Sequence, residues 1–178
     1  SLALLHQSSP REVLLKFNTK VVSPMKCIAL ILAGGRGTRF NSMRPKQYIE
    51  VDGMPIISYT LRSFEQHQGV TDIYVVCSPE WNEYVEEQAK KCGIRKFRSC
   101  ILSGETSFLS IRNGIEALQM MKMPNDSMVM VHDAVRPLFA QDTISNNINV
   151  CREHGNAITV IYSNEAYMKV SGGNEAVG

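Results

Sequence analysis

Apolar stretches of strand length alternate along the chain with stretches in which apolar residues recur at helical spacing. The apolar runs predict five strands, at residues 27–32, 72–78, 97–102, 127–132 and 157–162. The amphipathic stretches predict helices at residues 55–66, 107–121 and 142–154, and a further helix that begins at Pro79. This alternation is typical of βαβ units. We therefore expect an α/β, Rossmann-like fold, with a mostly parallel, twisted sheet and helices on both faces.

The carboxyl ends of the predicted strands carry the residues most suited to chemistry. In open parallel sheets, ligands bind beyond these ends. Residues 34–39 follow the first strand, and residues 133–136 follow the fourth. We therefore expect the two segments to border one crevice.

The first of these segments is a glycine-rich loop, in which residues 32–39 read Leu-Ala-Gly-Gly-Arg-Gly-Thr-Arg. Glycines allow backbone amides to approach an anion closely, and Arg39 adds a planar cation suited to phosphate. The loop is neither a Walker loop nor a dinucleotide fingerprint, because the Gly-Lys-Ser/Thr ending and the third glycine are missing. Taken alone, it fits a phosphate-binding loop and an ordinary strand-to-helix turn equally well.

Three further segments have both a functional and a structural interpretation. Lys46 follows Pro45, which stiffens the backbone, so its charge could stabilise a phosphoryl group; a solvated surface lysine is the alternative. Asp133 could hold Mg²⁺ against phosphates, or it could cap a turn and pair with Arg136. The turn around Gly104 could contact a ribose or a base, or it could simply cap the helix that follows.

Composition narrows the class of protein. The 178 residues suffice for one domain, and the net charge of +2 argues against the broad basic field of a nucleic-acid-binding protein. None of the five cysteines forms a Cys-x-x-Cys pair, which favours a reducing, cytoplasmic location. No apolar run approaches the roughly 20 residues that span a bilayer. We expect a cytoplasmic protein with small-molecule ligands and with neither a nucleic-acid nor a membrane partner.

The combination of three sequences is more specific than any one of them. The loop, the Pro-Lys-Gln-Tyr sequence of residues 45–48 and the Val-His-Asp-Ala-Val-Arg-Pro sequence of residues 131–137 resemble the cytidylyltransferases that activate small polyol phosphates. This family includes 2-C-methyl-D-erythritol 4-phosphate cytidylyltransferase and ribitol-5-phosphate cytidylyltransferase. The resemblance covers residues 26–170 and implies a fold like that of the nucleotide-diphospho-sugar transferases. It implies the reaction CTP + polyol phosphate → CDP-polyol + pyrophosphate, with Mg²⁺ as the cofactor.

The resemblance also implies roles for individual residues. The implied catalytic residues are Arg39, Lys46, Asp133 and Arg136, and Asp133 is also the implied metal ligand. The implied acceptor-binding residues are Asp133, Arg136 and Lys169. The implied nucleotide-binding residues follow two of the predicted strands and are Leu32, Ala33, Gly34, Gly35, Arg36, Gly37, Thr38, Gly104, Glu105 and Ser110.

The resemblance further bears on domain boundaries and assembly. It implies a catalytic domain at residues 25–178 that is truncated on its C-terminal side, because family members continue further. Residues 1–24 are weakly patterned, and we expect an N-terminal extension that partly derives from the expression vector or is poorly ordered. A short helix at residues 11–17 that docks on the domain is the alternative. Family members are typically homodimers, so a homodimer is expected for the full-length protein.

Two other functions stay open. The glycine-rich loop is shared with enzymes that transfer other nucleotides to sugar phosphates, so UTP, GTP or ATP could replace CTP. Ser107 stands where the family often has an arginine, and Ala166 stands where a threonine is expected. These departures are compatible with a non-catalytic nucleotide-binding module.

Overall fold

The computed structural model describes residues 25–35 and 44–160. Its centre is a four-stranded sheet in the order β5-β4-β1-β6, in which every neighbouring pair is parallel. The four strands are β1 (Cys27–Leu32), β4 (Asp72–Cys77), β5 (Phe97–Leu102) and β6 (Met128–Asp133). The predicted α/β class and the parallel sheet are confirmed.

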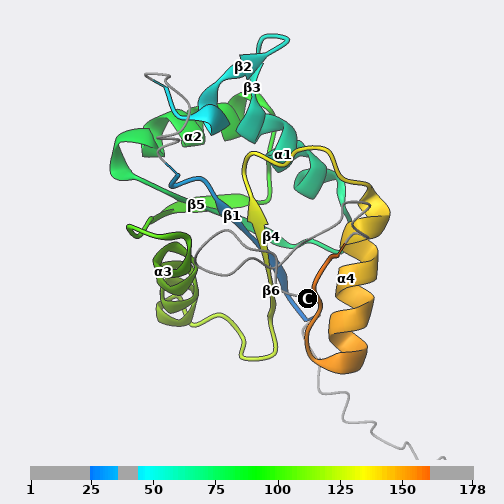
Figure 1. The fold of residues 1–178 in the computed structure, drawn as a ribbon. Coiled ribbons are helices and arrows are strands. Elements are labelled where there is room, and N and C mark those ends of the chain that lie inside the picture. The colour runs from blue at the N-terminus through cyan, green and yellow to red at the C-terminus, as the bar shows by residue number, and fades with distance from the viewer. Residues whose placement is uncertain (1–24, 36–43, 161–178) are drawn as a thin grey trace, which may run out of the picture.

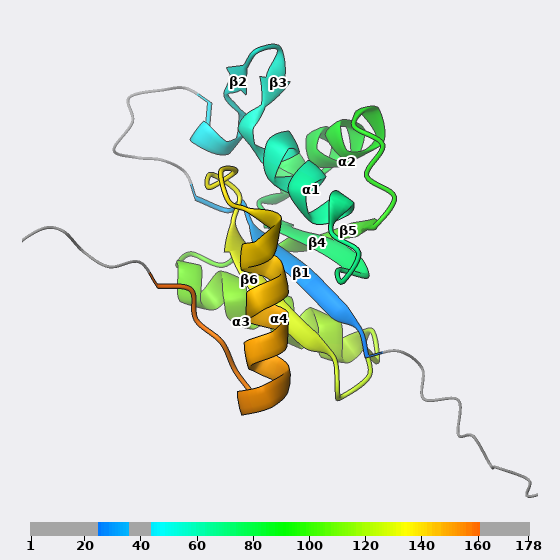
Figure 2. The ribbon, with the colours of Figure 1, turned by 90° about the vertical axis from the view of Figure 1, so that its right-hand side faces the viewer.

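Helices cover both faces of this sheet (Figure 1). One face carries α1 (Ile56–Gln66), α2 (Asn82–Lys91) and α4 (Gln141–His154), and the other carries α3 (Ser107–Met120). Two short 3-10 helices, η1 (Lys46–Tyr48) and η2 (Pro79–Trp81), precede α1 and α2. An antiparallel hairpin of β2 (Glu50–Val51) and β3 (Met54–Pro55) projects beyond α1 and α2, away from the sheet (Figure 2).

The alternation of side chains along β1 explains why the sheet is covered on both sides. Cys27, Ala29 and Ile31 belong to the core that contains residues of α1, α2 and α4. Ile28 and Leu30 belong to the second core, with residues of α3. All five side chains are at most 2% exposed. Because burial stabilises by roughly 25 cal/mol per Å² of apolar surface, a strand buried on both faces requires the continuous apolar run seen in the sequence.

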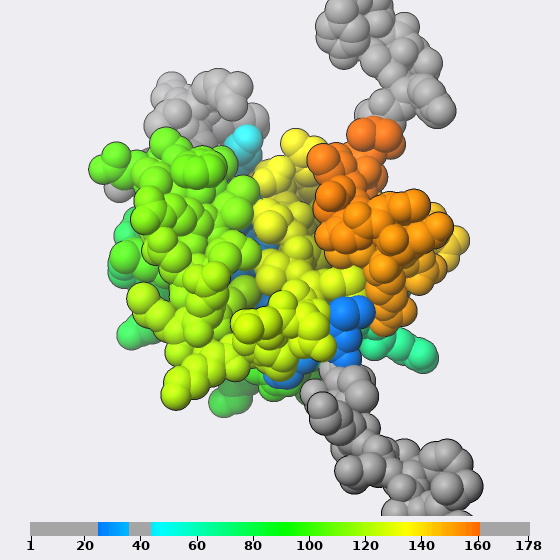
Figure 3. All heavy atoms as spheres, turned by 90° about the horizontal axis from the view of Figure 1, so that it is seen from below, coloured from blue at the N-terminus to red at the C-terminus, as the bar shows by residue number. Residues whose placement is uncertain are grey.

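The β6 end of the sheet is less buried. Val131 is 40% exposed, and within the described part of the chain β6 pairs with β1 alone. The yellow region of the chain that contains β6 reaches the surface between the green residues of α3 and the orange residues near 160 (Figure 3). The core is therefore centred on β1 and β4 rather than on β6.

Two features differ from the sequence-based expectations. Residues 157–160 of the predicted fifth strand are not in a strand, and residues 161 and 162 lie outside the described residues. Ile158 and Val160 are at least 80% exposed. An alternating pattern forms a strand only where a neighbouring strand pairs with it, and these residues have no such neighbour among the described residues. The hairpin was not predicted. Its strands are too short to show a period, although the turn at Asp52 and Gly53, with φ of 49° and 75°, is one that Asp-Gly favours.

Two further observations concern helices and thiols. No helix of the described residues is long and apolar enough to cross a membrane. All five cysteines are free thiols, and Cys27 and Cys77 are buried within strands. Both behave as small apolar residues of the core, as the sequence indicates.

The C-terminal end of α1 is held by Lys96 and His67. Lys96 Nζ donates to the main-chain carbonyls of Glu65 and His67, at 2.6 and 2.7 Å, near the helix end where carbonyls lack intrahelical donors. His67 Nδ1 accepts from Gly69 N at 3.1 Å, so Nε2 carries the proton and donates to Ser145 Oγ at 2.9 Å. Burial and, to a smaller extent, the Lys96 charge lower the pKa of His67 from its ordinary value of 6.5.

We expect His67 to make the protein less stable as the pH drops below about 6.5. Because the pKa of His67 is lowered in the folded state, the unfolded chain takes up the proton first, and this favours unfolding. Urea unfolding between about pH 8 and about pH 5 should show the loss, and His67→Asn should make the free energy of unfolding less dependent on pH. An equal pH dependence in the variant would exclude His67 as the source.

Candidate functional site

The carboxyl ends of β1, β4 and β6 meet at one edge of the sheet. Leu32 lies opposite Asp133 in the register of β1 and β6, and Ala134 N donates to Leu32 O at 2.9 Å. On the other side of β1, Ala33 N donates to Val76 O at 2.8 Å. The chain runs from β1 to β4 on one side and reaches β6 on the other, so the strand order reverses at β1. This switch point is where ligands bind in open α/β sheets.

Gly34 begins the glycine-rich loop at this edge and lies tightly against the turn after β5. A Cβ at Gly34 would be 2.5 Å from Ser103 Cβ and 2.9 Å from Ser103 Oγ. A Cβ at Gly35 would have nothing within 4 Å. Gly34 is therefore required for close packing against Ser103, whereas Gly35 borders open space.

The turn between β5 and α3 is fixed by two hydroxyl groups. Thr106 caps α3 by accepting from Leu109 N at 3.1 Å. Ser110 is buried, and its Oγ accepts from Gly104 N at 3.0 Å. The structural interpretation of this turn as a cap is thus confirmed. The Ser110 hydroxyl is thus bonded to Gly104 within the turn. A contact of Gly104, Glu105 and Ser110 with a nucleotide stays a prediction.

Lys46 lies in η1, directly after Pro45, as the stiffened segment predicts. Its side chain is exposed, whereas the next two residues, Gln47 and Tyr48, are buried. Gln47 Nε2 donates to Ala33 O at 2.5 Å and to Gly35 O at 3.0 Å. The structure therefore fixes η1 against the start of the glycine-rich loop.

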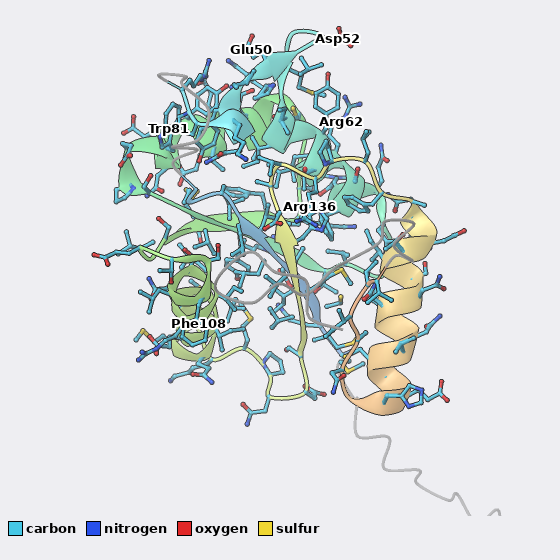
Figure 4. The ribbon with its side chains drawn as sticks, viewed as in Figure 1. Glu50, Asp52, Arg62, Trp81, Phe108 and Arg136 are labelled. Atoms are coloured by element: carbon cyan, nitrogen blue, oxygen red, sulfur yellow. The ribbon has the colours of Figure 1, made fainter. Side chains whose placement is uncertain are left out.

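An aromatic cluster supports η1 from the side of α2. Tyr48 stacks on Trp81 at 4.2 Å between ring centroids and meets Tyr84 edge-on at 5.5 Å. The Arg44 guanidinium lies 4.8 Å from the centre of the Tyr84 ring. Trp81 and Glu50 both lie on the η1 and hairpin side of the molecule (Figure 4). Arg44 on one side of this segment and Tyr48 on the other thus both contact aromatic rings of residues 81–84.

Arg136 lies beside the end of β6 (Figure 4), where it pairs with Asp133. Arg136 Nε lies 2.9 Å from Asp133 Oδ2, so the ion pair expected as a structural alternative is present. His132 packs between the rings of Phe64 and Phe139 and donates through Nε2 to Arg136 O at 2.9 Å, since a carbonyl only accepts. Burial lowers the pKa of His132 from its ordinary value, and the contacts of its ring and of its Nε2 are those of a packed, hydrogen-bonded histidine.

Asp133 could bind a divalent cation, but the described residues offer few other protein ligands for it. Within residues 25–35 and 44–160, no three His, Cys, Asp or Glu side chains come together as a metal cluster. Mg²⁺ commonly uses one or two carboxylates and takes its remaining ligands from substrate phosphates and water. The half-exposed Asp133 carboxylate suits that mode of binding, in which the cation would share the carboxylate with Arg136.

The structure brings together some of the predicted site residues. Leu32, Ala33 and Gly34 lie at the end of β1, with Gln47 bonded beneath them and Asp133 opposite Leu32. The predicted residues Arg36, Gly37, Thr38, Arg39 and Lys169 lie outside the described residues. Gln47 and the ring cluster were not among the predicted site residues. Gln47 belongs to the Pro-Lys-Gln-Tyr sequence, which was the one available signal.

A separate hollow of about 310 Å³ lies between α4 and the residues that follow it. Its lining contains no charged side chain and consists of Thr143, Asn146, Asn147, Val150, Ala157, Ile158, Thr159 and Val160. A triphosphate requires compensating cations, so this hollow does not suit a nucleotide. The end of β1 remains the candidate site.

A parallel sheet with a glycine-rich segment at its switch point defines the class of open α/β domains that bind ligands at this edge. Comparison with known families makes this more specific. Residues 27–177 match the profile of the IspD family, described as 2-C-methyl-D-erythritol 4-phosphate cytidylyltransferase. The chain therefore belongs to this family.

Individual relatives carry two names. A ribitol-5-phosphate cytidylyltransferase of Vibrio parahaemolyticus serotype O3:K6 is 40% identical over 80% of this chain and 60% of its own length. A 2-C-methyl-D-erythritol 4-phosphate cytidylyltransferase of Bifidobacterium longum subsp. infantis is 34% identical over 82% of this chain and 50% of its own length. The chain thus spans 50–60% of the length of these relatives.

A solved structure confirms the fold. The crystal structure of 4-diphosphocytidyl-2C-methyl-D-erythritol synthase from Anaerococcus prevotii superposes with a TM-score of 0.71. The two chains are 23% identical, and the match covers 85% of this chain and 62% of that one. At this identity the likeness concerns the fold alone.

Replacing Gly34 by alanine should destabilise the protein by about 1–3 kcal/mol, because the new Cβ would overlap Ser103 Cβ, which cannot rotate away. Gly35→Ala is the matched control, since its Cβ enters open space and its φ is not positive. Urea unfolding of both variants measures the difference. Equal stability of the two would show that the contact with Ser103 does not constrain the loop.

Proposed function

We propose that this protein is a CTP-dependent cytidylyltransferase that transfers CMP to a small polyol phosphate and releases pyrophosphate. The observation that carries the proposal is the meeting of Gly34, Gln47 and Asp133 at the strand switch point of a chain that belongs to the IspD family. In this proposal the end of β1 forms the nucleotide side of the site, and the end of β6 forms the opposite side.

The proposed reaction is a displacement at phosphorus. An oxygen of the polyol phosphate forms a bond to the α-phosphorus of CTP, and the bond to the bridging oxygen of the leaving pyrophosphate breaks. Phosphoryl transfer depends mainly on positioning and on compensation of negative charge. Lys46 and Arg39 would stabilise the charge that develops on the phosphates, and Arg36, Gly37 and Thr38 would complete the phosphate-binding loop.

Asp133 and Arg136 would act on the opposite side of the site. Mg²⁺, when bound, would neutralise phosphate charge, and Asp133 is the residue that would hold it. Arg136 would orient the Asp133 carboxylate through their ion pair and face the acceptor phosphate. Lys169 would add a second acceptor contact.

For the acceptor we propose ribitol 5-phosphate ahead of 2-C-methyl-D-erythritol 4-phosphate. Relatives named for ribitol 5-phosphate reach 40% identity, whereas those named for 2-C-methyl-D-erythritol 4-phosphate reach 34%. The Leu-Ala-Gly-Gly form of the loop also favours the first acceptor. We further propose a homodimer by the same resemblance, and a cytoplasmic location because all five cysteines are free thiols.

Pyrophosphate release by the full-length protein tests the function directly. We expect turnover with CTP, Mg²⁺ and ribitol 5-phosphate, a lower kcat/KM with 2-C-methyl-D-erythritol 4-phosphate, and little turnover with UTP, GTP or ATP. Turnover with another nucleotide would identify a different sugar-phosphate nucleotidyltransferase. Nucleotide binding without any turnover would identify a binding module.

Replacing Lys46 by alanine should lower kcat by at least about 100-fold, because the transition state would lose a cation. The fold should be unchanged, since the Lys46 side chain is exposed. Lys90→Ala removes an equally exposed lysine from the last turn of α2 and serves as the control. A Lys46→Ala variant as active as Lys90→Ala would remove Lys46 from the mechanism.

A further inference from the structure

Gln47 links the start of the glycine-rich loop to η1. These are the two segments that would contact the phosphates in the proposed site. Its side-chain amide has two N–H hydrogens, and both acceptors within reach of Nε2 are carbonyls of the glycine-rich segment. These are Ala33 O at 2.5 Å and Gly35 O at 3.0 Å. Gln47 is only 3% exposed, so water cannot easily replace either bond. Its neighbour in the chain is the exposed Lys46.

These two bonds orient the carbonyls of Ala33 and Gly35 at the start of the loop. Peptide bonds of the described residues are trans, so the carbonyl of Ala33 and the N–H of Gly34 point in opposite directions. Because the carbonyl of Ala33 is turned towards Gln47, the N–H of Gly34 is turned away from it. A phosphate-binding loop requires its amides on the side opposite the groups that hold its carbonyls.

Two further contacts hold the start of the loop. Gly34 packs against Ser103, and the Tyr48 hydroxyl lies 3.4 Å from Ala33 O. Tyr48 is itself fixed by stacking on Trp81. The start of the loop therefore lies between η1 and the β5–α3 turn, and its distance from Lys46 is determined by Gln47 and Tyr48.

We propose that Gln47 is a positioning residue, which sets the glycine-rich loop relative to Lys46 so that one triphosphate contacts both. The inference rests on the proposed function, because it assigns Gln47 to CTP binding. It makes a separate claim, namely that the nucleotide side depends on Gln47 and the acceptor side does not.

The experiment compares Gln47→Met with Gln88→Met in the full-length protein. Methionine keeps the length of the side chain but has no N–H donor. Gln88 is also a buried glutamine, but it lies in α2 and forms none of the loop bonds described above. Loss of two buried hydrogen bonds should raise the KM for CTP at least about tenfold and leave the KM for the polyol phosphate within about twofold.

Binding of inorganic tripolyphosphate with Mg²⁺ gives a second measurement. The Kd of tripolyphosphate should rise in Gln47→Met by about the same factor as the Kd of CTP, since the loop would hold phosphates rather than the base. In Gln88→Met the KM for CTP, the Kd of CTP and the Kd of tripolyphosphate should all stay within about twofold of wild type. A purely structural role would lower the active fraction, and hence the apparent kcat, without separating the two KM values.

The outcomes distinguish this inference from the proposed function. A Gln47→Met variant with the wild-type KM for CTP, or with both KM values raised equally, would overturn the role of Gln47 while the proposed function stands. A wild-type protein that binds no CTP would overturn the proposed function and, with it, the inference. Should Gln47→Met not fold, Gln47→Leu serves instead, because leucine is shorter, is uncharged and also lacks the N–H donors.

Discussion

The peptide groups at the end of β1 are the point on which the site depends. Leu32 O accepts from β6 through Ala134 N, and Ala33 N donates to β4 through Val76 O. Ala33 O then accepts from Gln47. Three segments far apart in the sequence are thus fixed to two consecutive residues, and the Leu32 carbonyl and both backbone groups of Ala33 have partners where β1 leaves the sheet.

Packing around this point leaves little freedom for the chain. Ala33 is buried, and Gly34 has no room for a side chain because Ser103 fills that space. Further along the α3 face of the sheet, a Cβ at Gly114 of α3 would be 2.5 Å from the Leu30 side chain. Small residues therefore occur where helix, strand and loop come closest, and the closeness brings the β5–α3 turn to the edge of the site.

Much of this arrangement could be predicted from the sequence, because its signals are local. The apolar run of β1 predicted the strand and its burial, and the helical spacing of residues 107–121 predicted α3 itself. The carboxyl-end rule placed residues 34 and 133 at one edge before any contact was known. Periodicity could not show that Gln47 points beneath the loop, since η1 is a single short turn and the bond joins residues 14 positions apart.

The failures have the same physical origin. Residues 157–160 carry a strand-like pattern, but pairing depends on a neighbouring strand that local sequence does not reveal. Charged residues of the site were easier to recognise in the sequence than the residues that hold them in place. Lys46, Asp133 and Arg136 attract attention as ionic residues, whereas the rings that fix the Lys46 segment looked like ordinary core residues of a helix face.

Trp81 is the only tryptophan of the 178 residues, and it stacks on Tyr48 within the segment that bears Lys46. Indole emission responds to nearby charge and to ring contact, so the natural fluorescence of this protein arises beside the proposed phosphate site. The sequence therefore contains its own optical label, which requires no added dye and no engineered residue.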